Sequence, residues 1–132
     1  LLADGFLDAL PGKAERLARG LDPLRDAAQF PHVRDVRQCG LMVGVEIGPP
    51  GQAGRTWLSG GSELGDFGET PDPQAHRPRW AYEICDAART RGLFIRPLGN
   101  VIVLMPPPAM TGEHLDALAA AVAATVAEHG PQ

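Results

Sequence analysis

The sequence is poor in lysine and aromatic residues, and it has no long apolar run. Its 132 residues include a single lysine, Lys13, beside eleven arginines, and only 5% are aromatic. No apolar stretch approaches the roughly 20 residues that span a bilayer, so we expect no membrane partner. The net charge is −4 and no basic stripe exists, so we expect no nucleic acid partner either.

Cysteine is also scarce, and the sequence shows no targeting signal. Cys39 and Cys85 match no metal-binding or redox spacing, which predicts free thiols in a reducing, cytoplasmic compartment. The start lacks the basic and apolar regions of a signal peptide. Its first residue is leucine, which fits a chain cut from something longer. The histidines and carboxylates form no metal-type pattern, so we expect no metal.

What is present predicts one domain over residues 1–132. Hydrophobic residues make up 44%, enough for a real core. Apolar periodicity predicts helices, and alternation predicts strands. The expected helices cover residues 2–10, 14–28, 77–91 and 111–129, and the expected strands cover 33–39, 41–47, 93–96 and 101–105. Thr111 is the expected N-cap of the last helix, and Asp22 that of a fresh turn at Pro23.

Two connections carry the strongest turn signals. Gly40 predicts a tight bend between the first two strands. Pro97 and Gly99 fit a type I turn that starts at Arg96 and joins the last two strands into a hairpin. Residues 48–75 are rich in Gly, Pro and acidic residues without periodicity, which predicts an exposed, flexible insertion without catalytic duty. The fold class is therefore α+β: a small antiparallel sheet of about three to four short strands, with helices packed on one face.

Arg96 is the sharpest candidate for a functional residue. It lies at a strand end before a stiff turn, where a guanidinium is well mounted to bind a carboxylate through two parallel hydrogen bonds. Glu46 alternates with apolar residues and is expected to be a solvent-facing or rim carboxylate. Arg34, Asp35 and Arg37 are expected to form local ion pairs on a polar strand edge. The three methionines are expected to be core or packing residues: Met42, Met105 and Met110.

Two runs of the sequence resemble a known family. Residues 91–107, RGLFIRPLGNVIVLMPP, are similar to the C-terminal signature of class III aminotransferases that use pyridoxal phosphate, and within them to those of biotin biosynthesis. Residues 33–46, VRDVRQCGLMVGVE, resemble the first sheet of the same small domain. The resemblance covers almost the whole chain outside residues 48–75. It implies fold type I, in which a large domain carries the cofactor and a small domain completes the substrate site.

The resemblance implies a role for Arg96 but no catalytic residue in this chain. Arg96 would bind the carboxylate of the keto acid 8-amino-7-oxononanoate, with Pro97, Gly99 and Asn100 shaping the turn that aims it. Pyridoxal 5'-phosphate would be bound by the large domain, because nothing around Lys13 suggests the desolvated pocket that a cofactor-binding lysine needs. The segment alone would then be inactive. S-adenosylmethionine would be the amino donor, and the full enzyme would be a homodimer.

Two alternatives stay open at this point. Some family members have a tyrosine where this chain has Val103, so another class III enzyme acting on a different amino or keto acid fits as well. A free-standing α+β binding or interaction module derived from such a domain is the second alternative.

Overall fold

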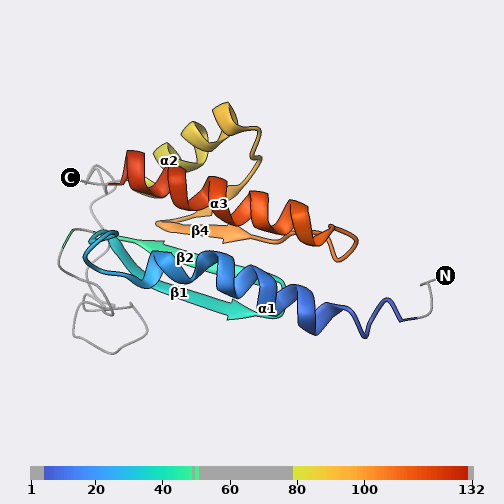
Figure 1. Ribbon diagram of the computed structural model, residues 1–132. Helices are drawn as coiled ribbons and strands as arrows, with labels where there is room; N and C mark the ends of the chain where they lie inside the picture. Colours follow the sequence, from blue (N-terminus) through green and yellow to red (C-terminus); the bar gives the residue numbers. More distant parts are fainter. Residues whose placement is uncertain (1–4, 49, 51–78, 131–132) are drawn as a thin grey trace, which may run out of the picture.

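The computed structural model describes residues 5–48, 50 and 79–130 (Figure 1). Three α-helices and one four-stranded antiparallel sheet, with strand order β1-β2-β4-β3, make up this part of the chain. The elements are α1 (Leu10–Leu21), the 3₁₀ helix η1 (Asp22–Arg25), β1 (Val33–Cys39), β2 (Met42–Ile47), α2 (Trp80–Ala88), the 3₁₀ helix η2 (Arg89–Arg91), β3 (Arg96–Leu98), β4 (Val101–Leu104) and α3 (Gly112–His129). The α+β prediction is confirmed.

The helices share one face of the sheet, and the core lies between the two layers. Figure 1 shows α1 and α3 side by side across the strands. Side chains on a strand alternate between faces, and every second residue of β2 and β4 is buried against the helices. The buried apolar residues of the strands are Val33, Val36, Val43, Val45, Ile47, Ile102 and Leu104, and those of the helices include Leu17, Leu21, Ile84, Leu115, Val122 and Val126.

A register shift in β1 keeps this alternation aligned with the core. Val33 pairs with Ile47 and Asp35 with Glu46, so Arg34 is the extra residue of a bulge. Val33 and Val36 therefore both face the helices, although they are three positions apart. Gly40, with φ 58°, makes the predicted tight bend into β2. The sheet face opposite the helices, called the open face below, carries Arg37, Gly44, Val103 and Arg96 in one cross-strand row.

The first helix differs from its prediction. Residues 5–9 form turns rather than a helix, and α1 begins at Leu10 with Pro11 in its first turn. Proline is tolerated there because the first N–H groups of a helix have no partner within it. Pro23 lies in the first turn of the 3₁₀ helix η1, but η1 begins at Asp22, its N-cap is Leu21, and no side chain caps it. The predicted helix over 14–28 therefore ends at Leu21 and continues only as η1.

The second half of the chain is closer to its prediction. Thr111 caps α3 by accepting a hydrogen bond from the N–H of His114. Gly92, with φ 74°, ends the α2–η2 helix as expected. Leu93, Phe94 and Ile95 do not form a strand, and β3 starts only at Arg96. The predicted insertion at 48–75 lies outside the described residues except for Gly48 and Pro50. No helix in residues 5–48, 50 and 79–130 is long and apolar enough to cross a membrane.

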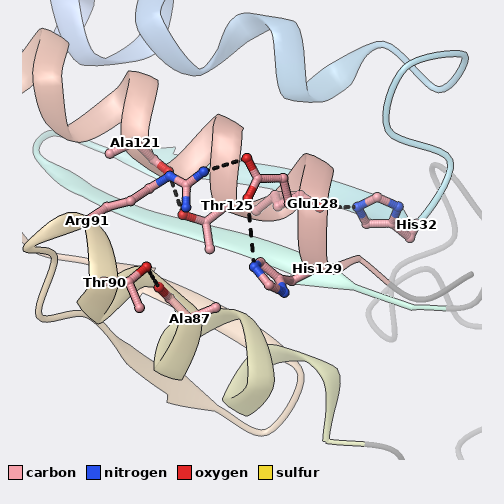
Figure 2. A network of polar contacts seen from close by, with 9 residues as sticks. His32, Ala87, Thr90, Arg91, Ala121, Thr125, Glu128 and His129 are labelled. Atoms are coloured by element: carbon pink, nitrogen blue, oxygen red, sulfur yellow. Dashed lines mark hydrogen bonds and ion pairs between the residues drawn. The ribbon is translucent and has the colours of Figure 1, made fainter.

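Polar contacts tie the C-terminal half of α3 to two other parts of the fold (Figure 2). Glu128 accepts a hydrogen bond from Arg91 at the end of η2. On the other side of the helix, the Nε2 atom of buried His32 lies 3.0 Å from the carbonyl oxygen of Val126. Because that carbonyl can only accept, His32 donates from Nε2. The segment that leads into β1 is thereby fixed to the end of α3.

We expect Leu17→Ala to destabilise the chain by about 2–5 kcal/mol, because Leu17 is fully buried and truncation leaves a cavity. The measurement is the free energy of unfolding from chemical denaturation. Leu7→Ala is the matched control, since Leu7 is 61% exposed, and it should change stability by less than about 0.5 kcal/mol. Equal losses in the two variants would contradict the described core.

A second prediction concerns His32 and pH. Burial lowers the pKa of His32 below its ordinary value, so the unfolded chain takes up this proton first as the pH falls. The stability contribution is complete above about pH 6.5, the unfolded pKa, and is lost as the pH falls below it. His32→Gln should therefore flatten the loss of unfolding free energy on the acid side of neutrality. An identical pH profile in both proteins would show that His32 titrates normally.

Candidate carboxylate-binding site

Arg96 lies on the open face, at the first position of β3. It pairs with Val103 of β4, and its neighbours across the sheet are Gly44 and Arg37. Arg96 is exposed. Within the described residues its guanidinium makes no hydrogen bond and no ion pair. A planar cation on a strand, without an internal partner, is available to a carboxylate from outside.

Arg96 is one of the residues that line a pocket of about 370 Å³. Its walls come from residues 92–96, from residues 103–107, from Met110 before α3 and from Leu118 within α3. The lining is mostly apolar and includes Leu93, Phe94, Ile95, Leu104, Met105, Pro106, Pro107, Met110 and Leu118. A cation at the edge of an apolar pocket matches the chemistry of a carboxylic acid that also has a carbon chain.

The turn after Arg96 differs from the predicted type I turn. Leu98 pairs with Val101, so only Gly99 and Asn100 lie between the strands. Gly99 has φ 59°, a conformation that suits a two-residue hairpin turn. Pro97 belongs to β3, which is an edge strand and tolerates proline. The carbonyl of Asn100 accepts a hydrogen bond of 2.8 Å from the N–H of Ile47, which ties the turn to the end of β2.

Glu46 was predicted to be a solvent-facing or rim carboxylate, and this prediction is wrong. The residue is buried, with 4% of its surface exposed. Arg37 donates to its Oε2 at 2.9 Å, and Arg34 lies 3.9 Å from Oε1. Arg37 also lies 3.4 Å from Asp35, one of the predicted local ion pairs. Both guanidinium groups come from β1, the strand beside Glu46 in the sheet. They cover the carboxylate, and this explains its burial. These four residues neutralise one another, whereas Arg96 on the same face has no such partner among the residues that the structure describes.

Lys13 makes an exposed polar contact with the segment before α3. Its Nζ donates a 2.7 Å hydrogen bond to the carbonyl of Pro108 and lies near the ring of Phe6. This exposed polar contact is unlike the desolvated pocket that a cofactor-binding lysine needs. Among the described residues no group of His, Cys, Asp or Glu could hold a metal ion.

Both cysteines are free thiols, as expected, and Cys39 is exposed whereas Cys85 is buried. Burial raises the pKa of the Cys85 thiol to about 11.

All three methionines were expected to be core or packing residues, and two of them are instead largely exposed. Met42 is 50% and Met105 70% exposed, whereas Met110 is half-buried. Phe94 and Leu98, two positions either side of Arg96, are also exposed, and sequence reasoning did not single them out. The alternation Phe94, Arg96, Leu98 was the available signal, because residues two apart on a strand share a face.

Comparisons with known proteins identify the family of this chain. The family model described as "Aminotransferase class-III" matches residues 2–126. The adenosylmethionine-8-amino-7-oxononanoate aminotransferase of Geobacter sulfurreducens is 36% identical over 116 residues, covering 88% of this chain and 21% of that protein. The enzyme of the same name from Nitratidesulfovibrio vulgaris is 37% identical over 127 residues, covering 94% of this chain and 20% of that protein. The chain thus spans about a fifth of the length of these curated relatives.

Solved structures show the same fold. The crystal structure of adenosylmethionine-8-amino-7-oxononanoate aminotransferase from Methanocaldococcus jannaschii superimposes with a TM-score of 0.70 at 22% identity, covering 96% of this chain and 24% of that one. An aminotransferase from Vibrio fluvialis gives a TM-score of 0.68 at 20% identity, over 96% of this chain and 24% of that one. The family model and the two curated relatives together show that the chain belongs to the class III aminotransferases.

Proposed function

We propose that this chain is the C-terminal portion of an aminotransferase of biotin biosynthesis, and that it closes the active site and binds the carboxylate of 8-amino-7-oxononanoate through Arg96. The observation that carries the proposal is the unpartnered guanidinium of Arg96 on the open face, at the edge of an apolar pocket. The names of the curated relatives support the choice of pathway and substrate.

The position of Arg96 suits the recognition of an acid. A guanidinium can bind both oxygens of a carboxylate, and the strand and the anchored turn limit how its backbone moves. Leu93, Leu104 and Met110 would then contact the aliphatic part of the same molecule. Holding the acid end fixes the position of the reacting end, which is how a residue far from the chemistry contributes to its rate.

Class III aminotransferases use pyridoxal 5'-phosphate, which supplies the electron sink for moving an amino group. The only lysine of this chain is Lys13, which does not fit as its attachment point. We therefore assign the cofactor to a large domain of the complete enzyme, and this segment alone would be inactive. S-adenosylmethionine as amino donor, a homodimeric complete enzyme and a cytoplasmic location belong to the same proposal.

We expect Arg96→Ala, made in the complete enzyme, to raise the KM for 8-amino-7-oxononanoate. Loss of a charge-assisted hydrogen bond costs about 1.5–3 kcal/mol, which is roughly a 10- to 150-fold change. The absorbance of the bound cofactor should stay the same. Arg96→Lys keeps the charge but loses the planar fork and should give an intermediate KM. Steady-state kinetics with the keto acid varied is the measurement.

Arg25→Ala is the matched control, because Arg25 is an exposed arginine of η1 whose ion pair with Asp22 is local. Its kinetics should equal those of the unaltered enzyme. An unchanged KM in Arg96→Ala would refute the carboxylate assignment. Faster turnover of a different keto acid by the unaltered enzyme would instead identify another class III activity and leave the role of Arg96 to be tested on that acid.

A further inference from the structure

The segment between β4 and α3 forms one wall of the pocket at Arg96, and four of its residues 105–110 line the cavity. We call these six residues the proline wall. Residues 106–108 are three consecutive prolines, which have no N–H group and cannot continue the hydrogen-bond ladder of β4. The N–H of Met110 bonds back to the carbonyl of Pro107 at 2.9 Å, within the same segment. The prolines thus leave this wall to be fixed by contacts with another element.

Helix α1 contacts the proline wall through Lys13. The ammonium Nζ of Lys13 donates a 2.7 Å hydrogen bond to the carbonyl oxygen of Pro108, which lies 95 positions later in the chain. A hydrogen bond from a charged donor is stronger than one between neutral groups. The contact ties the wall to a helix that itself packs beside α3 (Figure 1).

Arg16 lies one turn after Lys13 on α1 and holds the start of α3. Its Nε and Nη2 atoms donate to the two carboxylate oxygens of Asp116 at 2.8 and 2.6 Å. A guanidinium bound through two parallel hydrogen bonds is fixed in direction as well as in distance. The two side chains are 43% and 53% exposed, so the pair contributes little to the stability of the fold, and orientation is its main effect.

Gly112 is explained by the position of Arg16. It is the first residue of α3, and its φ is not in the left-handed region, so the backbone itself does not require glycine. A Cβ at this position would collide with the guanidinium of Arg16, which occupies that space. The absence of a side chain at Gly112 thus lets Arg16 lie against the first turn of α3 and reach Asp116.

We propose that Lys13 and Arg16 are positioning residues, which hold the proline wall at a fixed distance from Arg96 and thereby set the affinity for the carbon chain of the acid. The inference rests on the proposed function, in which this pocket receives the aliphatic part of the keto acid. Lys13 fixes the wall near its middle, and Arg16 fixes the start of the helix that follows it. A wall free to move outward would lose van der Waals contact with the carbon chain, while the carboxylate would stay bound at Arg96.

Lys13→Met, made in the complete enzyme, keeps an unbranched side chain but removes the charge and the donor. We expect the KM for the keto acid to rise about two- to tenfold, the range that one hydrogen bond accounts for, with kcat unchanged. Lys13→Arg keeps a cationic donor and should restore the KM, because a single carbonyl needs only one donor. Steady-state kinetics with the keto acid varied is the measurement.

Gly112→Ala is a second test, which leaves both cations in the chain. The added methyl group displaces the guanidinium of Arg16, so the KM for the keto acid should again rise about two- to tenfold. The free energy of unfolding should not fall, because alanine favours a helix more than glycine does. Gly12→Ala is the matched control, since Gly12 is an exposed glycine of α1 with nothing near its missing Cβ, and its KM should be unchanged.

Two straight-chain carboxylates, acetate and octanoate, separate this inference from the carboxylate assignment when they are used as competitive inhibitors against the keto acid. Lys13→Met and Gly112→Ala should weaken inhibition by octanoate and leave that by acetate unchanged, whereas Arg96→Ala should weaken both.

Three results would overturn the role of the proline wall: unchanged octanoate inhibition in Lys13→Met and Gly112→Ala, an equal loss for both carboxylates, or octanoate no stronger than acetate in the unaltered enzyme. Unchanged inhibition by both carboxylates in Arg96→Ala would overturn the carboxylate assignment instead.

Discussion

The one-sided packing of the sheet is the constraint on which the rest of this structure depends. Alternation along β2 and β4 sends Val43, Val45, Ile102 and Leu104 into a single core beneath the helices. The same alternation necessarily sends Gly44 and Val103 to the other face. The hydrophobic effect thus fixes the fold through one set of side chains and leaves the intervening set free to be chosen for function.

The location of Arg96 follows from this division. β3 is short and lies at the sheet edge, so it has few contacts of its own to hold it in place. Its register depends on β4, and the turn between them is fixed to the end of β2 by the hydrogen bond from Ile47 to Asn100. An arginine mounted in this way moves with the sheet as a whole. A guanidinium on an unanchored loop would lose more conformational freedom when it binds an acid.

Much of the fold could be predicted because the relevant signals are local. Thr111 caps a helix, Gly40 makes a bend and Gly92 ends a helix through preferences of those residues alone. The burial of Glu46 could not be predicted, because Arg34 and Arg37 reach it from the neighbouring strand β1. Their positions depend on a bulge in β1 that has no clear signal in the sequence. The turn type at Gly99 also depends on pairing, since the register of β3 with β4 decides which residues are left over for the loop.

The candidate site also has a part that could be predicted from the sequence and a part that could not. Arg96 could be proposed as a candidate binding residue from its predicted place at a strand end. The family resemblance added support to that prediction. The exposed Leu98 and Met42 were not distinguished from core residues, because periodicity shows that residues share a face but not whether that face is covered. Only the placement of all three helices on the opposite side shows which stripe of each strand stays bare.

The closure of this fold joins its two ends, and this affects how the protein is made. Arg16 of α1 donates to Asp116 of α3, a residue 100 positions later, and β2 pairs with β4, which lies far along the chain. A polypeptide emerging from the ribosome can form α1 and the first hairpin early, yet neither can bury its apolar stripe until the last helix follows. These apolar surfaces therefore stay exposed, and prone to aggregation, until α3 has been synthesised.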